Sequence, residues 1–458
     1  MKENNDNMKT ITMEEAARLV KEGEKATPEE RKALQRERLK TLVSYAREHS
    51  SYLRELYKNV PDDFELSDLP ILEKADGLLH YNEWVTDPEL SVEKVRDYLK
   101  RDSSDNSLLL GKYTALQTSG STGNPLPMVR DQQRNMIHGQ LLLQRLFYGV
   151  TPGYYDHSKH KTAFIVHLST SASSYGSYLK TRAKYPGYED NVTAISIMDS
   201  ADQMVEKLNA FQPKILVAYP PSLVMLAEEK AKGNLNISLG LIVSSAELLT
   251  EENYHRIHDV FGCPVLNNYC MTEGGEIAMT HDCPHLHINE DWIILEPVDE
   301  NRQPMKDNTE FSSGILVTDL SNFVQPIIRY YVGDSIRIGN EPHECFNLPV
   351  MEIRGRTWDS FNIGGKSFTT KALEVKAKFC EGLCSYQFVQ QDENTMELRG
   401  IVAAGFKNED VLKGLSKKIE EYFTEAGCEN ISVRYSTDPL LHNKNGGKTP
   451  MYINNAEV

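Results

Sequence analysis

The stretch Gln117–Pro127, QTSGSTGNPLP, is a run of small and hydroxylated residues that separates an apolar segment from a region expected to be helical. Its glycines allow a tight turn that brings backbone N–H groups against an anion, and its hydroxyls add further donors. The residues that would form this loop are Ser119, Gly120, Ser121, Thr122 and Gly123. Taken alone, the run is typical of either a phosphate-binding loop or a surface turn, and it lacks the GxxxxGK[ST] order of P-loop NTPases.

Further motifs follow this loop along the chain. They are NYCMTE at Asn268–Glu273, RYYVGD at Arg329–Asp334, Gly355–Arg356 ahead of Asp359, and GGK at Gly446–Lys448. In this order they resemble the core motifs of the adenylate-forming superfamily, which includes acyl-CoA synthetases, luciferases and adenylation domains. The resemblance is to the phenylacetate-CoA ligase-like branch, whose members begin with a helix like Leu42–Tyr57 and a short element like Leu69–Leu72. It extends from about Leu42 to Lys448.

Length and composition set broad limits on function. The chain has 458 residues, and its net charge of −16 argues against a broad nucleic-acid-binding surface. No apolar run approaches the length of a membrane span, and the first residues, MKENNDNMKT, are too polar for a secretory signal. Seven cysteines without a regular framework favour a reducing compartment. We therefore expect a cytoplasmic protein without nucleic-acid or membrane partners; a homodimer is compatible with the sequence.

The pattern of secondary structure predicts the fold class. Short β-like runs alternate with helical stretches from Gly111 to about Leu348, which predicts an α/β core with a parallel sheet. Runs at Trp292–Val298, Gly314–Asp319 and Ser335–Ile338 predict a small β subdomain beside this core. We expect residues 1–355 to form this N-terminal core, with residues 1–40 as peripheral helices. The mixed pattern after residue 355 predicts an α+β C-terminal domain over 356–458, and the resemblance implies that this domain is mobile.

The resemblance implies a reaction and the residues that perform it. A small-molecule carboxylic acid would be activated by ATP to an acyl-adenylate and then transferred to coenzyme A. Thr122 in the loop would lie near the Mg²⁺ shell. Tyr269 would stack on adenine, Thr272 would face the phosphates, and the carboxylate of Glu273 would hold Mg²⁺, which prefers oxygen ligands. The alternative is that Tyr269 is a core aromatic and Glu273 a solvated charge.

Other nucleotide contacts are implied in the same way. The adenine pocket would be lined by Ser245, Ala246, Glu247 and Asn268. Asp334 can accept hydrogen bonds from both ribose hydroxyls, and Arg356 can reach the ribose or phosphate region; outside this context an aspartate after glycine is a turn former. Lys448 would contact the acyl-phosphate oxygen during adenylation, with Lys444 as the alternative. A lysine near the end of a chain is otherwise a solvated charge.

The sequence departs from the family pattern at three places. Asn124–Pro127 lacks the lysine usual at the end of the phosphate loop, so positive charge must come from elsewhere, with Arg130 and Arg134 as candidates. RYYVGD carries Tyr-Val where Arg-Thr is common. Trp358 stands where many relatives have a hinge aspartate, which leaves the hinge motion open.

A cluster of metal-binding residue types lies in THDCPHLHINED. His281, Cys283 and His287, with Cys345 farther along the chain, would supply the nitrogen and sulfur ligands of tetrahedral Zn²⁺. Some relatives place a structural zinc site in the corresponding segments. The chain would have to bend at Pro284 for these side chains to converge. The alternative is a polar loop with free histidines and a buried cysteine.

The sequence says less about the acyl acceptor and about the carboxylic acid substrate. A carrier-protein thiol or an amine would use the same adenylation residues as coenzyme A. Small and aromatic residues in His167–Tyr178 and Tyr219–Pro221 favour an aryl acid. A non-catalytic nucleotide-binding homologue is the alternative from a different class, supported by the altered phosphate loop and Trp358.

Overall fold

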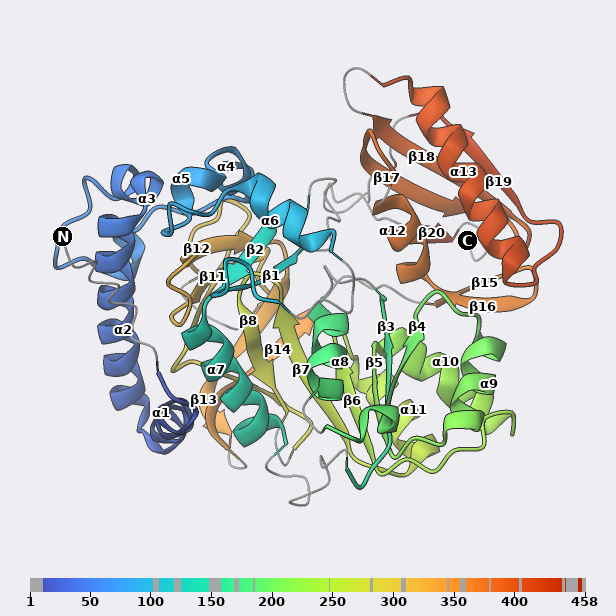
Figure 1. Ribbon diagram of the computed structural model, residues 1–458, viewed down its shortest axis with the longest axis horizontal. Helices are drawn as coiled ribbons and strands as arrows, with labels where there is room; N and C mark the ends of the chain where they lie inside the picture. Colours follow the sequence, from blue (N-terminus) through green and yellow to red (C-terminus); the bar gives the residue numbers. More distant parts are fainter. Residues whose placement is uncertain are drawn as a thin grey trace. The chain divides into compact units, whose positions relative to one another are not determined.

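The computed structural model describes residues 11–101, 107–118, 125–147, 158–168, 173–183, 186–246, 248–280, 283–305, 310–343, 346–354, 360–378, 380–402, 406–438, 441 and 452–454. The chain divides into two compact units, whose helices and strands are labelled in Figure 1. The first unit comprises residues 1–118, 126–156 and 266–356, and the second comprises 119–125, 157–265 and 357–458. No helix in these described ranges is long and apolar enough to cross a bilayer.

Side-chain caps set the boundaries of the helices that open the first unit. These are α1 (Met13–Lys25), α2 (Pro28–His49), α3 (Ser51–Leu56), the 3-10 helix η1 (Leu66–Asp68), α4 (Lys74–Leu79), α5 (Tyr81–Trp84) and α6 (Val92–Leu99). Thr27 and Glu30 form a capping box at the start of α2. Ser50 accepts a hydrogen bond of 3.1 Å from the backbone N–H of Leu53. The helix expected over residues 42–57 is therefore divided at Ser50, because this residue has an extended backbone and caps α3.

Buried arginines attach the N-terminal helices to the turn at residues 289–292. Arg145, in the π-helical segment η2 (Leu142–Leu146), donates two hydrogen bonds of 2.9 Å to the carboxylate of Asp291. Arg31 of α2 pairs with Glu290 at 2.5 Å. The side chains of Arg31, Arg145 and Asp291 are almost fully buried, so each charge depends on its partner.

The strands within the first unit pair antiparallel. They are β1 (Thr114–Gln117), β2 (Pro127–Arg130), β7 (Val265–Met271), β8 (Gly275–Met279), β9 (Leu286–Ile288), β10 (Ile293–Val298), β11 (Gly314–Asp319), β12 (Ile327–Val332), β13 (Ser335–His343) and β14 (Phe346–Arg354). β1 and β2 form a hairpin, β13-β14-β9-β8-β7 are neighbours in one sheet, and β10-β11-β12 form a smaller sheet. Ile277, Val317 and Ile336 belong to the apolar core of this β structure.

One strand of the expected β subdomain pairs differently. The runs at 292–298 and 314–319 do lie in the small sheet as β10 and β11, but the run at 335–338 belongs to β13 and pairs with β14. β12 takes the third place and pairs with β11, and Gly333 and Asp334 separate it from β13.

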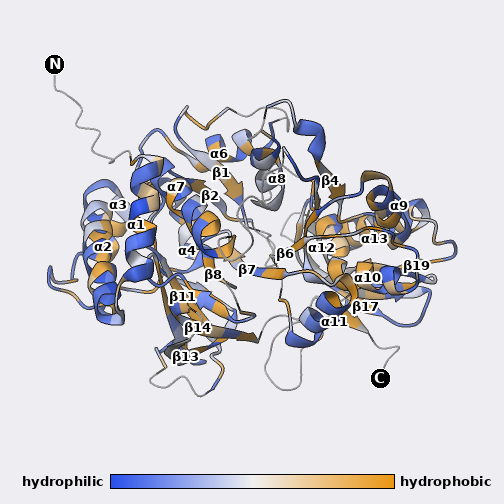
Figure 2. Cartoon of the chain, turned by 90° about the horizontal axis from the view of Figure 1, so that it is seen from below, coloured by the Kyte–Doolittle hydropathy of each residue, from blue (hydrophilic) through white to orange (hydrophobic). Residues whose placement is uncertain are grey.

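The second unit contains the predicted parallel sheet. Its strands are β3 (Thr162–Val166), β4 (Val192–Ser196), β5 (Ile215–Ala218) and β6 (Leu241–Ser245), and its helices here are α8 (Ser173–Ala183), the 3-10 helix η3 (Glu189–Asn191), α9 (Ala201–Phe211), α10 (Pro220–Ala231) and α11 (Glu251–Phe261). The pairs β3–β4, β3–β5 and β5–β6 are all parallel. Figure 2 shows β6 as hydrophobic and α11 as largely hydrophilic, as expected of a buried strand and a surface helix.

The C-terminal segment of the second unit has its own core. Its elements are β15 (Ser360–Ile363), β16 (Lys366–Thr369), α12 (Thr370–Lys378), β17 (Leu383–Gln390), β18 (Thr395–Val402), α13 (Asn408–Glu425), β19 (Ser432–Ser436) and β20 (Tyr452–Asn454). The sheet order is β19-β18-β17-β20. Tyr422 donates a 3.0 Å hydrogen bond to the carbonyl of Met198 in the same unit. A mobile domain over 356–458 stays a prediction.

Candidate active site

The NYCMTE motif lies where β7 ends and turns into β8. Tyr269 and Cys270 are on β7, and the turn at residues 272–274 carries Thr272 and Glu273. Gly275, which starts β8, has a φ of 72°, and a Cβ atom there would lie 2.5 Å from the ring of His138. Both facts require glycine at this position, so the turn is held close to the helix that carries His138, α7 (Gln132–Leu141).

Tyr269 and Asp334, which were predicted to bind adenine and ribose, are in direct contact. Tyr269 donates a hydrogen bond of 2.8 Å from its hydroxyl to Oδ2 of Asp334. Asp334 follows β12, whereas Tyr269 lies on β7, so the structure brings two distant motifs together. Asn268 is buried beside Tyr269, with 6% of its surface exposed.

Glu273, the predicted Mg²⁺ ligand, lies close to the buried Tyr330. The pKa of Tyr330 is raised by burial and by the nearby Glu273 carboxylate. Burial also raises the pKa of Glu273, with a further contribution from Asp334, while Lys74 and Arg130 act in the opposite direction. A bound divalent cation would relieve this penalty on the charged carboxylate, so an oxygen ligand at this position suits Mg²⁺.

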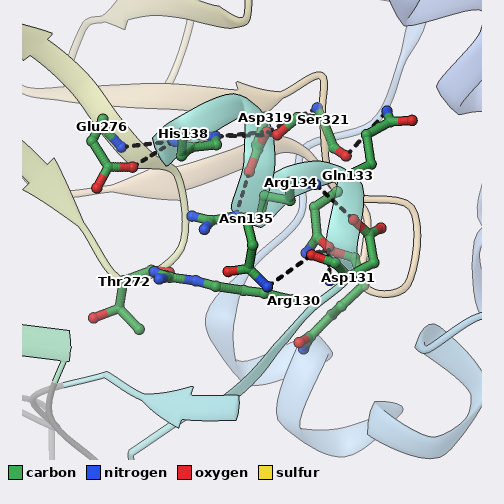
Figure 3. Close-up of polar contacts among 12 residues, drawn as sticks. Arg130, Asp131, Gln133, Arg134, Asn135, His138, Thr272, Glu276, Asp319 and Ser321 are labelled. Atoms are coloured by element: carbon green, nitrogen blue, oxygen red, sulfur yellow. Dashed lines mark hydrogen bonds and ion pairs between the residues drawn. The ribbon is translucent and has the colours of Figure 1, made fainter. Parts of the chain in front are cut away.

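A network of buried charges supports the same turn (Figure 3). Arg134 of α7 pairs with Asp319 of β11 at 2.9 Å. His138 of α7 lies between Glu276 of β8, with Nδ1 2.6 Å from Oε2, and Ser321, with Nε2 3.1 Å from Oγ. These contacts connect α7 to β8 and to the end of β11, next to the β7–β8 turn.

The carboxylates of this network are kept ionised. Burial alone would raise the pKa of Glu276, but the hydrogen bond and charge of His138, together with Arg134 and Arg130, lower it to about 2. The pKa of Asp319 is likewise lowered below its usual range against the effect of burial, chiefly by His138 and Arg134. The sequence pointed to Arg134 but not to these other members, because only tertiary packing brings 138, 276 and 319 together.

The strands β1 and β2 flank the segment that was predicted to bind phosphate. Gln117 and Pro127 are opposite each other in the β1–β2 hairpin. The backbone N–H of Thr118 donates to the Leu126 carbonyl at 3.0 Å, and the N–H of Leu126 donates to the Thr118 hydroxyl at 2.9 Å. These bonds bring together the two ends of the segment that carries the loop.

Several predicted site residues lie outside the described residues. These are Ser119, Gly120, Ser121, Thr122, Gly123, Glu247, His281, Cys345, Arg356 and Lys448. In the second unit, Ser245 ends β6 and Ala246 follows with a φ of 73°. A left-handed backbone is uncommon for alanine and often accompanies a functional constraint.

Two members of the predicted zinc set are adjacent. Sγ of Cys283 lies 3.2 Å from Nε2 of His287. Nδ1 of His287 lies 3.2 Å from the Leu348 carbonyl, an arrangement that leaves Nε2 facing the sulfur, as in many metal-binding histidines. Cys283 is disulfide-bonded in this structure, so its sulfur would have to be reduced to bind a metal. No cluster of three metal-binding side chains occurs within the described residues.

Comparisons with known proteins agree with the motif order. No model of a known protein family matches the sequence. Phenylacetate-coenzyme A ligase from Thermus thermophilus is 26% identical over 418 residues, 86% of each chain. Protein CapK from Staphylococcus aureus is 26% identical over 258 residues, and the match spans 55% of each protein.

The fold gives the same result. A 2-hydroxyisobutyryl-CoA ligase, solved with 2-HIB-AMP and CoA, matches with a TM-score of 0.57 and 18% identity, covering 94% of this chain and 91% of that one. The same ligase in its postadenylation state with 2-HIB-AMP matches with a TM-score of 0.55 and 17% identity, over 95% and 92%. The chain therefore has the fold of the adenylate-forming CoA ligases. Its sequence is similar to that of phenylacetate-coenzyme A ligase, as the ordered motifs predicted.

Proposed function

We propose that this protein activates a carboxylic acid with ATP and transfers the acyl group to coenzyme A, giving an acyl-CoA thioester, AMP and pyrophosphate. The observation that carries the proposal is the grouping of Tyr269, Asp334 and the Thr272–Glu273 turn on a fold shared with CoA ligases. These side chains offer an aromatic face, a ribose acceptor and a phosphate-facing turn.

The chemistry assigns each residue one task. A carboxylate oxygen attacks the α-phosphorus of ATP, the bond to the bridging oxygen breaks, and pyrophosphate leaves. Tyr269 and Asp334 position the nucleoside, while Thr272 faces the phosphates and Lys448 contacts the carboxylate oxygen. Mg²⁺ held by Glu273 would neutralise phosphate charge. The thiol of coenzyme A then releases its proton to solvent, attacks the carbonyl carbon as the thiolate and displaces AMP.

An aryl acid is the favoured substrate. In the second unit, Ser174 and Tyr219 hydroxyls lie 2.7 Å apart, and the rings of Tyr175 and Tyr178 stack with centroids 5.4 Å apart. Aromatic faces with a few polar groups suit a flat acid. A carrier-protein thiol or an amine is the alternative acyl acceptor. The proposed assembly is a homodimer, which is to be tested against a monomer.

A structural zinc site is proposed for His281, Cys283, His287 and Cys345. It is supported by the contact between Cys283 and His287 and by the orientation of the histidine ring. The site would stabilise the fold and take no part in acyl transfer.

The test is carboxylate-dependent ATP–pyrophosphate exchange across aryl, heteroaryl and short aliphatic acids. Exchange with an aryl acid is expected, and Lys448→Ala should abolish it. Lys417→Ala is the matched control, because Lys417 is an exposed lysine of α13, with 76% of its side chain accessible. ATP binding without exchange for any acid would instead support the non-catalytic nucleotide-binding alternative.

A further inference from the structure

The side chain of Arg130 extends from the β1–β2 hairpin to the β7–β8 turn (Figure 3). The residue ends β2, and its Nη2 donates a hydrogen bond of 3.0 Å to the backbone carbonyl of Thr272. Its guanidinium is therefore adjacent to the residue that the proposed function places against the phosphates of ATP.

The carboxylates around Arg130 are engaged elsewhere. Asp319 is paired with Arg134 at 2.9 Å, and Glu276 with His138 at 2.6 Å. Within the described part of the chain, no ion pair joins Arg130 to a carboxylate. The guanidinium is therefore available to pair with an anionic group from outside the network.

The next carboxylate along the chain is also occupied. Asp131 caps α7 by accepting a 2.8 Å hydrogen bond from the backbone N–H of Arg134. Its other oxygen accepts from the backbone N–H groups of Phe323, at 2.7 Å, and Val324, at 3.3 Å. Both oxygens of the Asp131 carboxylate therefore accept hydrogen bonds from backbone N–H groups, and Arg130 does not form an ion pair with it.

Arg130 is costly to keep in this position without a counter-charge. Its Nε is buried and has no hydrogen-bond partner. Burial, followed by repulsion from Arg134, lowers the pKa of Arg130 to about 9, so the guanidinium stays charged at neutral pH. Glu276 and Asp319 oppose this shift, but neither forms an ion pair with Arg130, and buried cations of this kind are commonly kept for function. The residue retains some solvent exposure, which gives a ligand access.

We propose that Arg130 binds the pyrophosphate half of ATP, and this inference rests on the proposed function. The planar guanidinium matches phosphate oxygens and would supply the positive charge that the lysine-free segment Asn124–Pro127 lacks. Arg134, the other sequence candidate, is excluded because it is 1% exposed and paired with Asp319. Arg130 also stabilises the charge that develops on pyrophosphate as it leaves.

The test compares ligands that contain or lack the β- and γ-phosphates. Dissociation constants for ATP, pyrophosphate and AMP are measured by calorimetry for wild type, Arg130→Met, Arg130→Lys and the surface control Arg36→Met. Loss of a charge-assisted contact should weaken ATP and pyrophosphate about 10- to 100-fold in Arg130→Met and leave AMP within about threefold. The melting temperature is measured in parallel, because Arg130→Met also removes the hydrogen bond to the Thr272 carbonyl and a charge that helps keep Glu276 ionised.

The alternatives give different patterns. Equal weakening of ATP and AMP would overturn the proposal, because Arg130 would then only order the turn at Thr272. Unchanged ATP binding would overturn it as well. If Arg130→Met does not fold, Arg130→Lys decides: ATP and pyrophosphate should bind more weakly while AMP is unaffected, and equal effects on ATP and AMP refute the assignment. A wild-type protein that binds neither nucleotide overturns the proposed function together with this inference, whereas absent exchange with normal ATP binding overturns only the reaction.

Discussion

Replacing Glu276 by glutamine removes one carboxylate from the buried network and keeps the size of the side chain. Glu276 is 17% exposed and lies 2.6 Å from His138. Its pKa is lowered from the ordinary 4.5 to about 2, and each pKa unit corresponds to about 1.4 kcal/mol. The folded state therefore gains about 3 kcal/mol at neutral pH from keeping this group ionised, and Glu276→Gln should lower the free energy of unfolding by about that amount.

The effect has a defined dependence on pH. Because the pKa of Glu276 is lower in the folded state, its contribution is fully present above about pH 4.5 and is lost as the pH falls towards 2. The difference between wild type and Glu276→Gln should thus narrow to about 2 kcal/mol near pH 3.5. Urea unfolding at several pH values between about 7 and 3.5 measures it.

A surface carboxylate provides the control for this series. Glu352 is 61% exposed and pairs with Arg337, so Glu352→Gln should change stability by no more than about 0.5 kcal/mol. A Glu276→Gln cost below about 1 kcal/mol, or one that grows on acidification, would refute the reasoning that His138 and its neighbours stabilise the ionised carboxylate.

Three further predictions concern other parts of the molecule. Asp291→Ala leaves Arg145 buried without its partner and should cost about 3–5 kcal/mol in urea unfolding; a cost below about 1 kcal/mol would contradict the anchoring role. Tyr269→Phe removes the hydrogen bond that orients Asp334 and should weaken ATP about three- to tenfold by calorimetry, with a smaller effect on 2′-deoxy-ATP; equal effects would disprove ribose positioning. Protein purified under reducing conditions should carry about one zinc per chain by elemental analysis and lose it in Cys283→Ser; metal-free wild type would refute the zinc site.

Elements with strong local patterns could be predicted from the sequence. The alternation of apolar runs and helical stretches gave β3, β5 and β6 with the helices between them, and the structure confirms their parallel pairing. The ends of helices and the pairing of strands could not be predicted from the periodicity of apolar residues. Ser50 divides a continuous helical pattern because its hydroxyl caps the next helix, and the run at 335–338 pairs with β14 rather than with the small sheet.

At the candidate site, residues within sequence motifs could be predicted, whereas residues brought together only by tertiary packing could not. The motifs carrying Tyr269 and Asp334 were recognised from their order, and the structure places the two side chains in contact. His138, Glu276 and Asp319 were not predicted, because a lone histidine or carboxylate in sequence gives no sign of the strands against which its helix will pack. That Arg130 has no ion pair among the described residues likewise follows only from knowing which carboxylates are already paired.

The most direct test of the proposed reaction follows the oxygen atoms of the acid. An aryl carboxylic acid that supports exchange is labelled with ¹⁸O in its carboxyl group and incubated with ATP, Mg²⁺, coenzyme A and the protein, and the products are analysed by mass spectrometry. Because the carboxylate attacks the α-phosphorus and AMP later leaves from the carbonyl carbon, one ¹⁸O should appear in AMP and the acyl group in a thioester. Label in inorganic phosphate with formation of ADP, or unlabelled AMP beside acyl-CoA, would contradict an acyl-adenylate intermediate.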